Sequence, residues 1–175
     1  MVYSSDWTER WNNIVDSYNQ ETDRAAAILA ASFLEEFLKV CIQSFLIDDS
    51  SVKKFKGYTS IEDLFKGYAP LSTFSARTHI AFALGLMSEQ VNRDLYYIRK
   101  VRNHFSHHPS DASFEDQDVK NWCSNLSTAQ PIVREGITFK ESNPKKQYLS
   151  AIGISIVKVH NIRMEEEQRL IPYKE

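Results

Sequence analysis

Residues 25–47, AAAILAASFLEEFLKVCIQSFLI, form a long apolar stretch in the first third of the 175-residue chain. Apolar side chains recur at spacings of three and four on several sides of this stretch, which predicts a helix that other helices cover. Glu35, Glu36 and Lys39 in its middle make it a poor membrane span, because charged side chains are costly in hydrocarbon. We therefore expect a buried central helix.

Further segments on both sides continue the helical spacing. The expected helices span residues 6–19, 60–66, 74–87, about 92–108, about 116–126 and 144–170, and the central helix runs from a cap at Thr22 or Asp23 to about Ile47. We predict an all-α single domain over residues 1–175. It is an irregular bundle of about six or seven helices around the apolar central helix, with a loose tail at 170–175.

Two segments need separate interpretation. Gly85 lies inside the helix expected at 74–87, where glycine costs stability, so we expect it to serve close packing. Residues 132–141 are short, β-prone and interrupted by a glycine, which leaves an extended connection and a small hairpin both open.

The composition narrows the function classes. A net charge of −2 argues against holding nucleic acid by bulk electrostatics, which needs a clustered excess of Lys and Arg. The basic group at residues 53–56, KKFK, is therefore interpreted as a solvated loop. Cys41 and Cys123 lack metal-ligand spacing, and residues 1–10 lack the apolar core of a signal peptide. We expect a cytoplasmic protein with no cofactor and no membrane contact.

Chemistry-bearing side chains concentrate in residues 97–109, YIRKVRNHFSHHP, at the end of an amphipathic helix that Pro109 terminates. Arg102 and His107 have the types and spacing of a phosphate-binding cation and a proton-transfer group in a metal-free nuclease. The alternative is structural: Arg102 pairs with an acidic residue of the central helix, Asn103 caps a carbonyl, and the imidazoles lie near the negative end of the helix dipole. The histidines have no matching ligand cluster nearby, so no metal site is expected.

Glu35 and Glu36 are the acidic residues inside the apolar helix. Adjacent residues on a helix point about 100° apart, so these carboxylates do not act as a pair on one substrate. A buried Glu needs a partner, and an Arg clamp from a neighbouring helix supplies one. We predict a structural polar cluster that comprises Glu35, Glu36, Arg77, Arg99, Arg102 and Asn103, and we assign no catalytic residue.

Three blocks carry a resemblance to a known family. They are residues 23–38, DRAAAILAASFLEEFL, then residues 74–77, FSAR, and residues 98–107, IRKVRNHFSH. In this order and spacing the chain resembles the mannitol operon repressor family of bacteria over residues 6–126. The resemblance implies an all-helical protein that lowers expression of a mannitol uptake and oxidation operon. It also implies a fold without a recognised DNA-reading motif, which acts on DNA directly or through a partner protein.

The Arg-Asn-x-x-x-His block also resembles the HEPN superfamily of helical ribonucleases and toxin components. That resemblance implies that Arg102 and His107 are a catalytic pair, oriented by an acidic residue of the central helix, Glu35 or Glu36.

We expect a transcriptional repressor of a sugar-alcohol operon that binds DNA or a protein partner and performs no catalysis. A metal-independent ribonuclease or toxin-system component is the first alternative, and a plain protein-interaction module is the second. Trp7 and Trp11 supply a possible homodimer surface, although covering the chain's own core is the favoured use.

Overall fold

The computed structural model describes residues 6–46, 60–108, 110–134, 137–139 and 141–165. Within them lie six α-helices, two short 3-10 helices and two strands. In chain order they are α1 (Asp6–Gln20), α2 (Asp23–Phe45), η2 (Ile61–Phe65), α3 (Phe74–Ala83), α4 (Glu89–His107), α5 (Gln117–Ser124), η3 (Ser127–Ala129), β1 (Ile132–Arg134), β2 (Ile137–Phe139) and α6 (Pro144–Glu165). The prediction of an all-α bundle is confirmed. The basic group at 53–56 and the tail at 170–175 lie outside the described residues.

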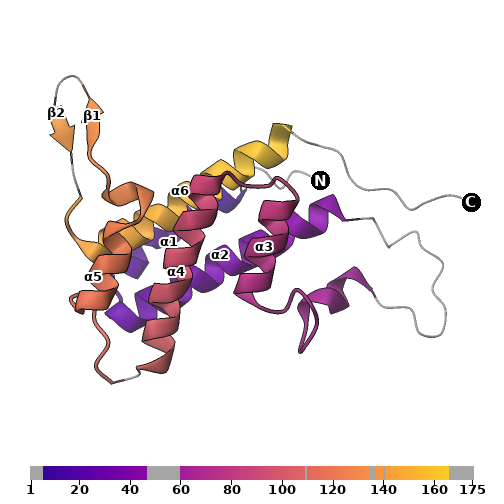
Figure 1. Ribbon diagram of the computed structural model, residues 1–175, viewed down its shortest axis with the longest axis horizontal. Coiled ribbons are helices and arrows are strands. Elements are labelled where there is room, and N and C mark those ends of the chain that lie inside the picture. Colours follow the sequence, from indigo (N-terminus) through magenta and orange to yellow (C-terminus); the bar gives the residue numbers. More distant parts are fainter. Residues whose placement is uncertain (1–5, 47–59, 109, 135–136, 140, 166–175) are drawn as a thin grey trace, which may run out of the picture.

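Helix α2 is the centre of the bundle, as its apolar sequence predicts. It packs against α1, α3, α4 and α6, and Figure 1 shows it behind α3 and α4 with α6 alongside. Thr22 caps it, because its side chain accepts a hydrogen bond from the backbone N–H of Ala25 at 3.3 Å. Ala26, Ala27, Ala30 and Ala31 are buried, and such small side chains let neighbouring helices approach closely.

Aromatic side chains fill the space between α2 and its neighbours. The Tyr148 hydroxyl of α6 is fully buried and donates to the carbonyl of Ala27 at 2.8 Å, so α6 is tied to α2. On α1, Trp7 and Trp11 are each 5% exposed and contact the Phe33 ring with centroids 5.1 and 5.6 Å away. Both indoles therefore cover the core of this chain.

The segment after α3 departs from the predicted pattern. The helix expected at 74–87 ends at Ala83, and Gly85 has a φ of 74°, a left-handed conformation that L residues adopt at a cost. A Cβ on Gly85 would meet no atom within 4 Å, so the expectation that it serves close packing is wrong. Gly85 instead permits the turn into α4, which begins at a Ser88 cap, four residues before Asn92.

The C-terminal part of the described chain contains a pair of short strands followed by the last helix. Strands β1 and β2 pair antiparallel, with Ile132 opposite Phe139, and Figure 1 shows the two strands projecting from the end of the bundle where α5 lies. Residues Pro144–Glu165 form a helix, as predicted, while the expected continuation to residue 170 lies outside the described residues. The side chain of Asn143 accepts a hydrogen bond from the Lys146 N–H at 3.0 Å. In the described part of the chain, no helix is long and apolar enough to cross a membrane.

Candidate functional site

Helix α4 carries the predicted chemistry-bearing residues, and its periodicity determines which of them face outward. Val91, Leu95, Ile98, Val101 and Phe105 are buried and recur at spacings of three and four. Asp94 is buried too, and its carboxylate accepts hydrogen bonds from the backbone N–H and the hydroxyl of Ser127, at 2.9 and 2.6 Å. The other polar residues of α4 lie on the sides and outer face of the helix. Helix α4 ends at His107, with His108 as the C-terminal cap, so the histidine run occupies its last turn as expected.

A carboxylate of α2 connects three helices. Glu35 lies 3.5 Å from Nη1 of Arg77 on α3 and 3.9 Å from Nη2 of Arg102 on α4. Its side chain is 17% exposed and that of Arg77 is 9% exposed. Arg77 also donates to the backbone carbonyls of Leu71, Glu35 and Phe65, at 2.9, 3.2 and 3.4 Å. All three guanidinium nitrogens of Arg77 are thus used in holding the fold.

Arg102 is less fully engaged than Arg77. Its side chain is 33% exposed, and Nη1 donates to Oδ1 of Asn103 at 3.2 Å. Its Nε is buried and has no hydrogen-bond partner among the described residues. The structure therefore brings together four members of the predicted polar cluster, namely Glu35, Arg77, Arg102 and Asn103.

Two members of the predicted cluster lie elsewhere. The Glu36 side chain is 53% exposed and pairs with Lys39 of its own helix at 3.6 Å. The Arg99 guanidinium lies 5.8 Å from the Tyr96 ring centroid and lines a groove between α3 and α4. The angular offset of adjacent helical residues explains why only one of the two glutamates faces the bundle interior.

The histidine run forms a contact with α5 that the sequence did not indicate. His104 Nε2 lies 3.0 Å from Oδ2 of Asp116, and its ring stacks on His108 with centroids 4.4 Å apart. The backbone N–H of Ser113 donates to Asp116, and this bond, followed by the contact with His104, holds the pKa of the Asp116 carboxyl below its usual value. Local spacing gives no signal for the contact of His104 with Asp116, because the two residues are twelve positions apart.

Arg102 and His107 occupy different sides of α4. His107 is exposed on the last turn, whereas Arg102 reaches toward Glu35. Five residues at about 100° each separate the two positions by about 140° around a regular helix. The resemblance to helical ribonucleases implies that these two residues share one site. On a single copy of α4, however, the two side chains start from different sides of the helix.

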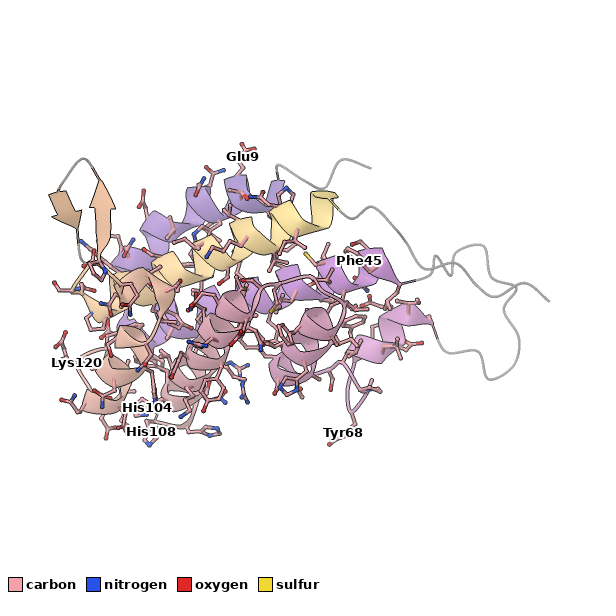
Figure 2. All side chains as sticks on the ribbon, turned by 45° about the horizontal axis from the view of Figure 1, so that its top comes forward. Glu9, Phe45, Tyr68, His104, His108 and Lys120 are labelled. Carbon is pink, nitrogen blue, oxygen red and sulfur yellow. The ribbon has the colours of Figure 1, made fainter. Side chains whose placement is uncertain are left out.

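A cationic and aromatic surface lies where α4 meets α5. Lys100 Nζ is 5.2 Å from the Tyr96 ring centroid and 5.4 Å from that of Trp122, a cation–π arrangement with two rings. His104 also meets the Trp122 ring edge, at 5.8 Å between centroids. We call Tyr96, Lys100, His104, His108 and Trp122 the α4–α5 surface, and Figure 2 shows its two histidines at the same end of the molecule as Lys120.

This surface has the chemistry of an interaction site. Tyrosine and tryptophan are enriched in protein interfaces because they bury much area at little entropic cost, and an accompanying cation favours acidic partners. No group of three His, Cys, Asp or Glu side chains suitable for a metal ion occurs in the described ranges. Trp122 was missed as a site residue because its spacing within α5 marks it equally well as a core position.

Comparison with known proteins identifies relatives. The family model described as "Mannitol repressor" (MtlR) matches residues 11–168. The mannitol operon repressors of Escherichia coli K12 and of Escherichia coli O6:H1 are each 26% identical over 110 residues, which cover 62% of this chain and 54% of each relative. The matched segment therefore spans about half the length of these relatives. A chain in the X-ray structure of the MtlR–HPr complex from Escherichia coli matches with a TM-score of 0.54 and 18% identity, over 89% of this chain and 96% of that one.

Proposed function

The chain belongs to the mannitol repressor family, as the three sequence blocks predicted, and from this we propose that it represses a mannitol utilisation operon by binding a protein partner. The observation that carries the proposal is the family match over residues 11–168, which extends from α1 into the last helix. It includes the C-terminal third of the chain, where the sequence blocks added little. Under this proposal the protein acts in the cytoplasm, because that is where a bacterial operon is regulated.

Support for a protein partner comes from the related solved structure. The Escherichia coli relative was solved in complex with HPr, and it shares the fold over 89% of this chain. We assign to this chain a partner of the same kind, HPr from its own organism. The alternative of direct DNA contact has weaker support, because the net charge is −2 and phosphate binding depends on an excess of cations.

We assign the contact to the α4–α5 surface. Lys100 between two aromatic rings offers a cation on a rigid platform, and Tyr96 is 44% exposed. Large aromatic side chains with an adjacent cation are typical of the residues that contribute most to binding energy. This role needs no proton transfer and no bound cofactor.

The experiment measures the two binding modes side by side. Purified protein is titrated calorimetrically with HPr from the same organism, and gel shifts with mannitol operator DNA are run at several salt concentrations. We expect saturable HPr binding and no sequence-specific shift of the DNA. A specific shift whose affinity falls with salt, without HPr binding, would replace the protein-partner mechanism by direct repression.

A pair of charge variants locates the surface. Lys100→Gln and Lys158→Gln remove the same charge, but Lys158 is exposed on α6, on a different element. Lys100→Gln is expected to weaken HPr binding by about fivefold to tenfold, since an interfacial charged contact contributes about 1 kcal/mol or more. Equal affinities for the two variants would reject the α4–α5 surface. A reporter under the mannitol promoter, in a strain that lacks the gene for this protein, links binding to repression. Only variants that bind the partner should restore repression of the reporter.

A further inference from the structure

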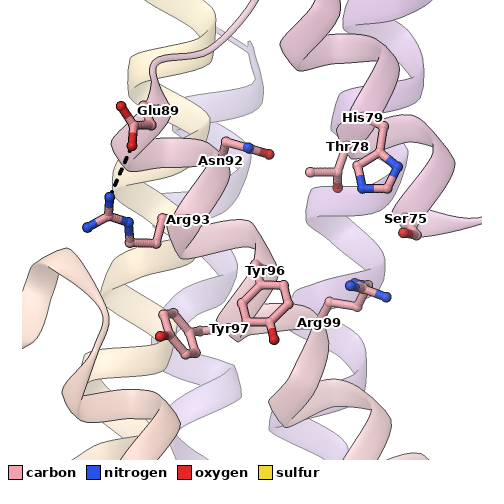
Figure 3. A pocket seen from close by; sticks show the side chains of 9 residues that line it. All are labelled: Ser75, Thr78, His79, Glu89, Asn92, Arg93, Tyr96, Tyr97 and Arg99. Atoms are coloured by element: carbon pink, nitrogen blue, oxygen red, sulfur yellow. Dashed lines mark hydrogen bonds and ion pairs between the residues drawn. The ribbon is translucent and has the colours of Figure 1, made fainter.

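The groove between α3 and α4 carries a positive charge that no function described above uses. It has a volume of about 400 Å³, within the range of roughly 300–1,000 Å³ typical of small-molecule sites. Ser75, Thr78 and His79 of α3 line one side, and α4 supplies Glu89, Asn92, Arg93, Tyr96, Tyr97 and Arg99, as Figure 3 shows. It lies beside the α4–α5 surface and shares Tyr96 with it.

The charges in the groove do not cancel. Glu89 pairs with Arg93 at 3.1 Å, so that arginine is already compensated. Arg99 has no carboxylate within ion-pairing distance in the described part of the chain, and its guanidinium contacts the Tyr96 ring at 5.8 Å. Two arginines against one glutamate leave one net positive charge in the lining, on a half-buried side chain. Figure 3 places Arg99 below Ser75 and His79, at the side of the groove where the two helices face each other.

Uncommitted hydrogen-bonding groups surround this charge. The Thr78 hydroxyl donates to the Phe74 carbonyl at 2.9 Å and is therefore occupied. The side chains of Ser75, His79 and Asn92 make no hydrogen bond to any described residue, and all three face the groove. One guanidinium beside several neutral donors and acceptors suits a ligand with one anionic group and several hydroxyls.

We propose that the α3–α4 groove binds a small polyhydroxylated molecule with a single anionic group, a polyol phosphate or a sugar acid, whose anion contacts Arg99 and whose hydroxyls contact Ser75, His79 and Asn92. Such a ligand spans two helices, and it stabilises the folded state by RT ln(1 + L/Kd), where L is the free ligand concentration. This site goes beyond the proposed repressor function and does not depend on it, because ligand binding is measured on the isolated protein.

The test is a calorimetric titration of the full chain with four probes. They are a hexitol phosphate, a hexonate, the uncharged hexitol and inorganic phosphate, each at constant ionic strength. We expect binding of the hexitol phosphate or the hexonate, or both, and at least tenfold weaker binding of the other two probes. The preferred anion distinguishes a phosphate ester from a carboxylate. Failure of both charged polyols to bind at millimolar concentration would overturn the proposal, as would equal affinity for inorganic phosphate.

Matched variants connect binding to the groove. Arg99→Gln should weaken binding at least tenfold, Arg99→Lys should retain part of it, and Lys158→Gln should leave it unchanged. Asn92→Ala should weaken binding of the polyol phosphate severalfold but leave binding of inorganic phosphate unchanged, since only the polyol phosphate offers polyol hydroxyls to Asn92. Undiminished binding by Arg99→Gln would place the ligand elsewhere and reject the site. Binding of a poly-glutamate peptide in preference to the charged polyols would make the groove a protein contact and would likewise reject it.

Discussion

Arg77 of α3 contacts Glu35 of α2 twice, through the side-chain carboxylate at 3.5 Å and through the backbone carbonyl at 3.2 Å. The Arg77 guanidinium therefore contacts the backbone of α2 as well as the charged side chain that α2 carries. Because Arg102 of α4 approaches the same carboxylate at 3.9 Å, one glutamate orients three helices. These bundle-holding contacts are separate from the α4–α5 surface, which involves other side chains of α4 together with Trp122 of α5.

The first prediction concerns the two adjacent glutamates. Glu35→Gln should lower the free energy of unfolding by about 2 kcal/mol, because removing one partner of a largely buried ion pair leaves the other charge uncompensated. The loss stays below the largest values for buried pairs because Arg77 keeps its carbonyl hydrogen bonds. Urea unfolding followed by circular dichroism at 222 nm, a standard helix signal, measures the change.

Glu36→Gln provides the matched control for that experiment. The Glu36 side chain is 53% exposed, and Lys39 keeps a second partner, Glu62, at 2.9 Å. Its removal should cost about 0.5 kcal/mol or less, as is usual for exposed ion pairs. If both glutamate variants unfold at the same urea concentration, Glu35 does not have the structural role assigned to it.

The second prediction compares two glycines that the structure requires for different reasons. Gly85→Ala should destabilise by about 1–2 kcal/mol, because an L residue is strained at a φ of 74° even though its Cβ meets no neighbour. Gly153→Ala places a methyl group against the buried Trp11 indole, which should cost about 1–3 kcal/mol through overpacking. Thermal unfolding of the two variants measures both losses.

A double-mutant cycle separates the two mechanisms. Trp11→Phe shortens the ring that a Cβ at position 153 would strike, so part of the Gly153→Ala loss should disappear in the double variant. The same Trp11→Phe change should add independently to Gly85→Ala. Additivity in both pairs would show that steric overlap with the indole is not the cause at position 153.

The sequence predicted the elements of this fold better than their mutual contacts. The core periodicity of α2 is a local signal and is confirmed, and of the two caps that the sequence left open, Thr22 or Asp23, Thr22 is the cap. Which of the two glutamates, Glu35 or Glu36, meets the arginines depends on how α2 is rotated about its axis relative to α3 and α4. The sequence of a single helix does not contain that information. Gly85 was misinterpreted because apolar residues continue through it to Met87, whereas the chain turns there and buries Leu86 and Met87 from outside the helix.

In the candidate site, too, local features were predicted and contacts between helices were not. The position of the histidine run in the last turn of α4 followed from two local signals, the helical spacing of the apolar residues before it and the proline at position 109. The contact of His104 with Asp116 did not, because it depends on the path of the loop between α4 and α5. The α4–α5 surface likewise requires Lys100 and Trp122 to meet across two helices, and no spacing within either helix reveals that contact.

The third prediction concerns the pH dependence of stability. The pKa of Asp116 is lowered in the folded state, first by the Ser113 N–H and then by His104. A lowered carboxyl pKa contributes stability above the unfolded value, about 3.9, and that contribution is lost as the pH falls through the folded pKa. The stability difference between wild type and Asp116→Asn should therefore be full at pH 6–7 and should shrink toward zero below about pH 4. Urea midpoints across this pH range measure the difference.

Asp118→Asn is the control for the Asp116 experiment. It removes a carboxylate from the exposed side of the same helix, so its effect on stability should be small at every pH. His104→Ala should reduce the Asp116 contribution without abolishing it, since the Ser113 hydrogen bond remains. A constant difference between wild type and Asp116→Asn from pH 3 to pH 7 would contradict the assigned cause.

The fourth prediction addresses the ribonuclease alternative directly. Arg102 is directed toward Glu35, and His107 is exposed about 140° away around α4, so one copy of the chain does not present both groups to one phosphate. Purified protein incubated with RNA in the absence of metal is expected to give no cleavage that depends on these side chains. Arg102→Ala and His107→Ala are assayed beside wild type, with equal folding of all three verified by circular dichroism. Cleavage by wild type that both substitutions abolish would show that the two residues form a working site, supplied in that case by two copies of the chain, and it would replace binding by catalysis as the function of α4.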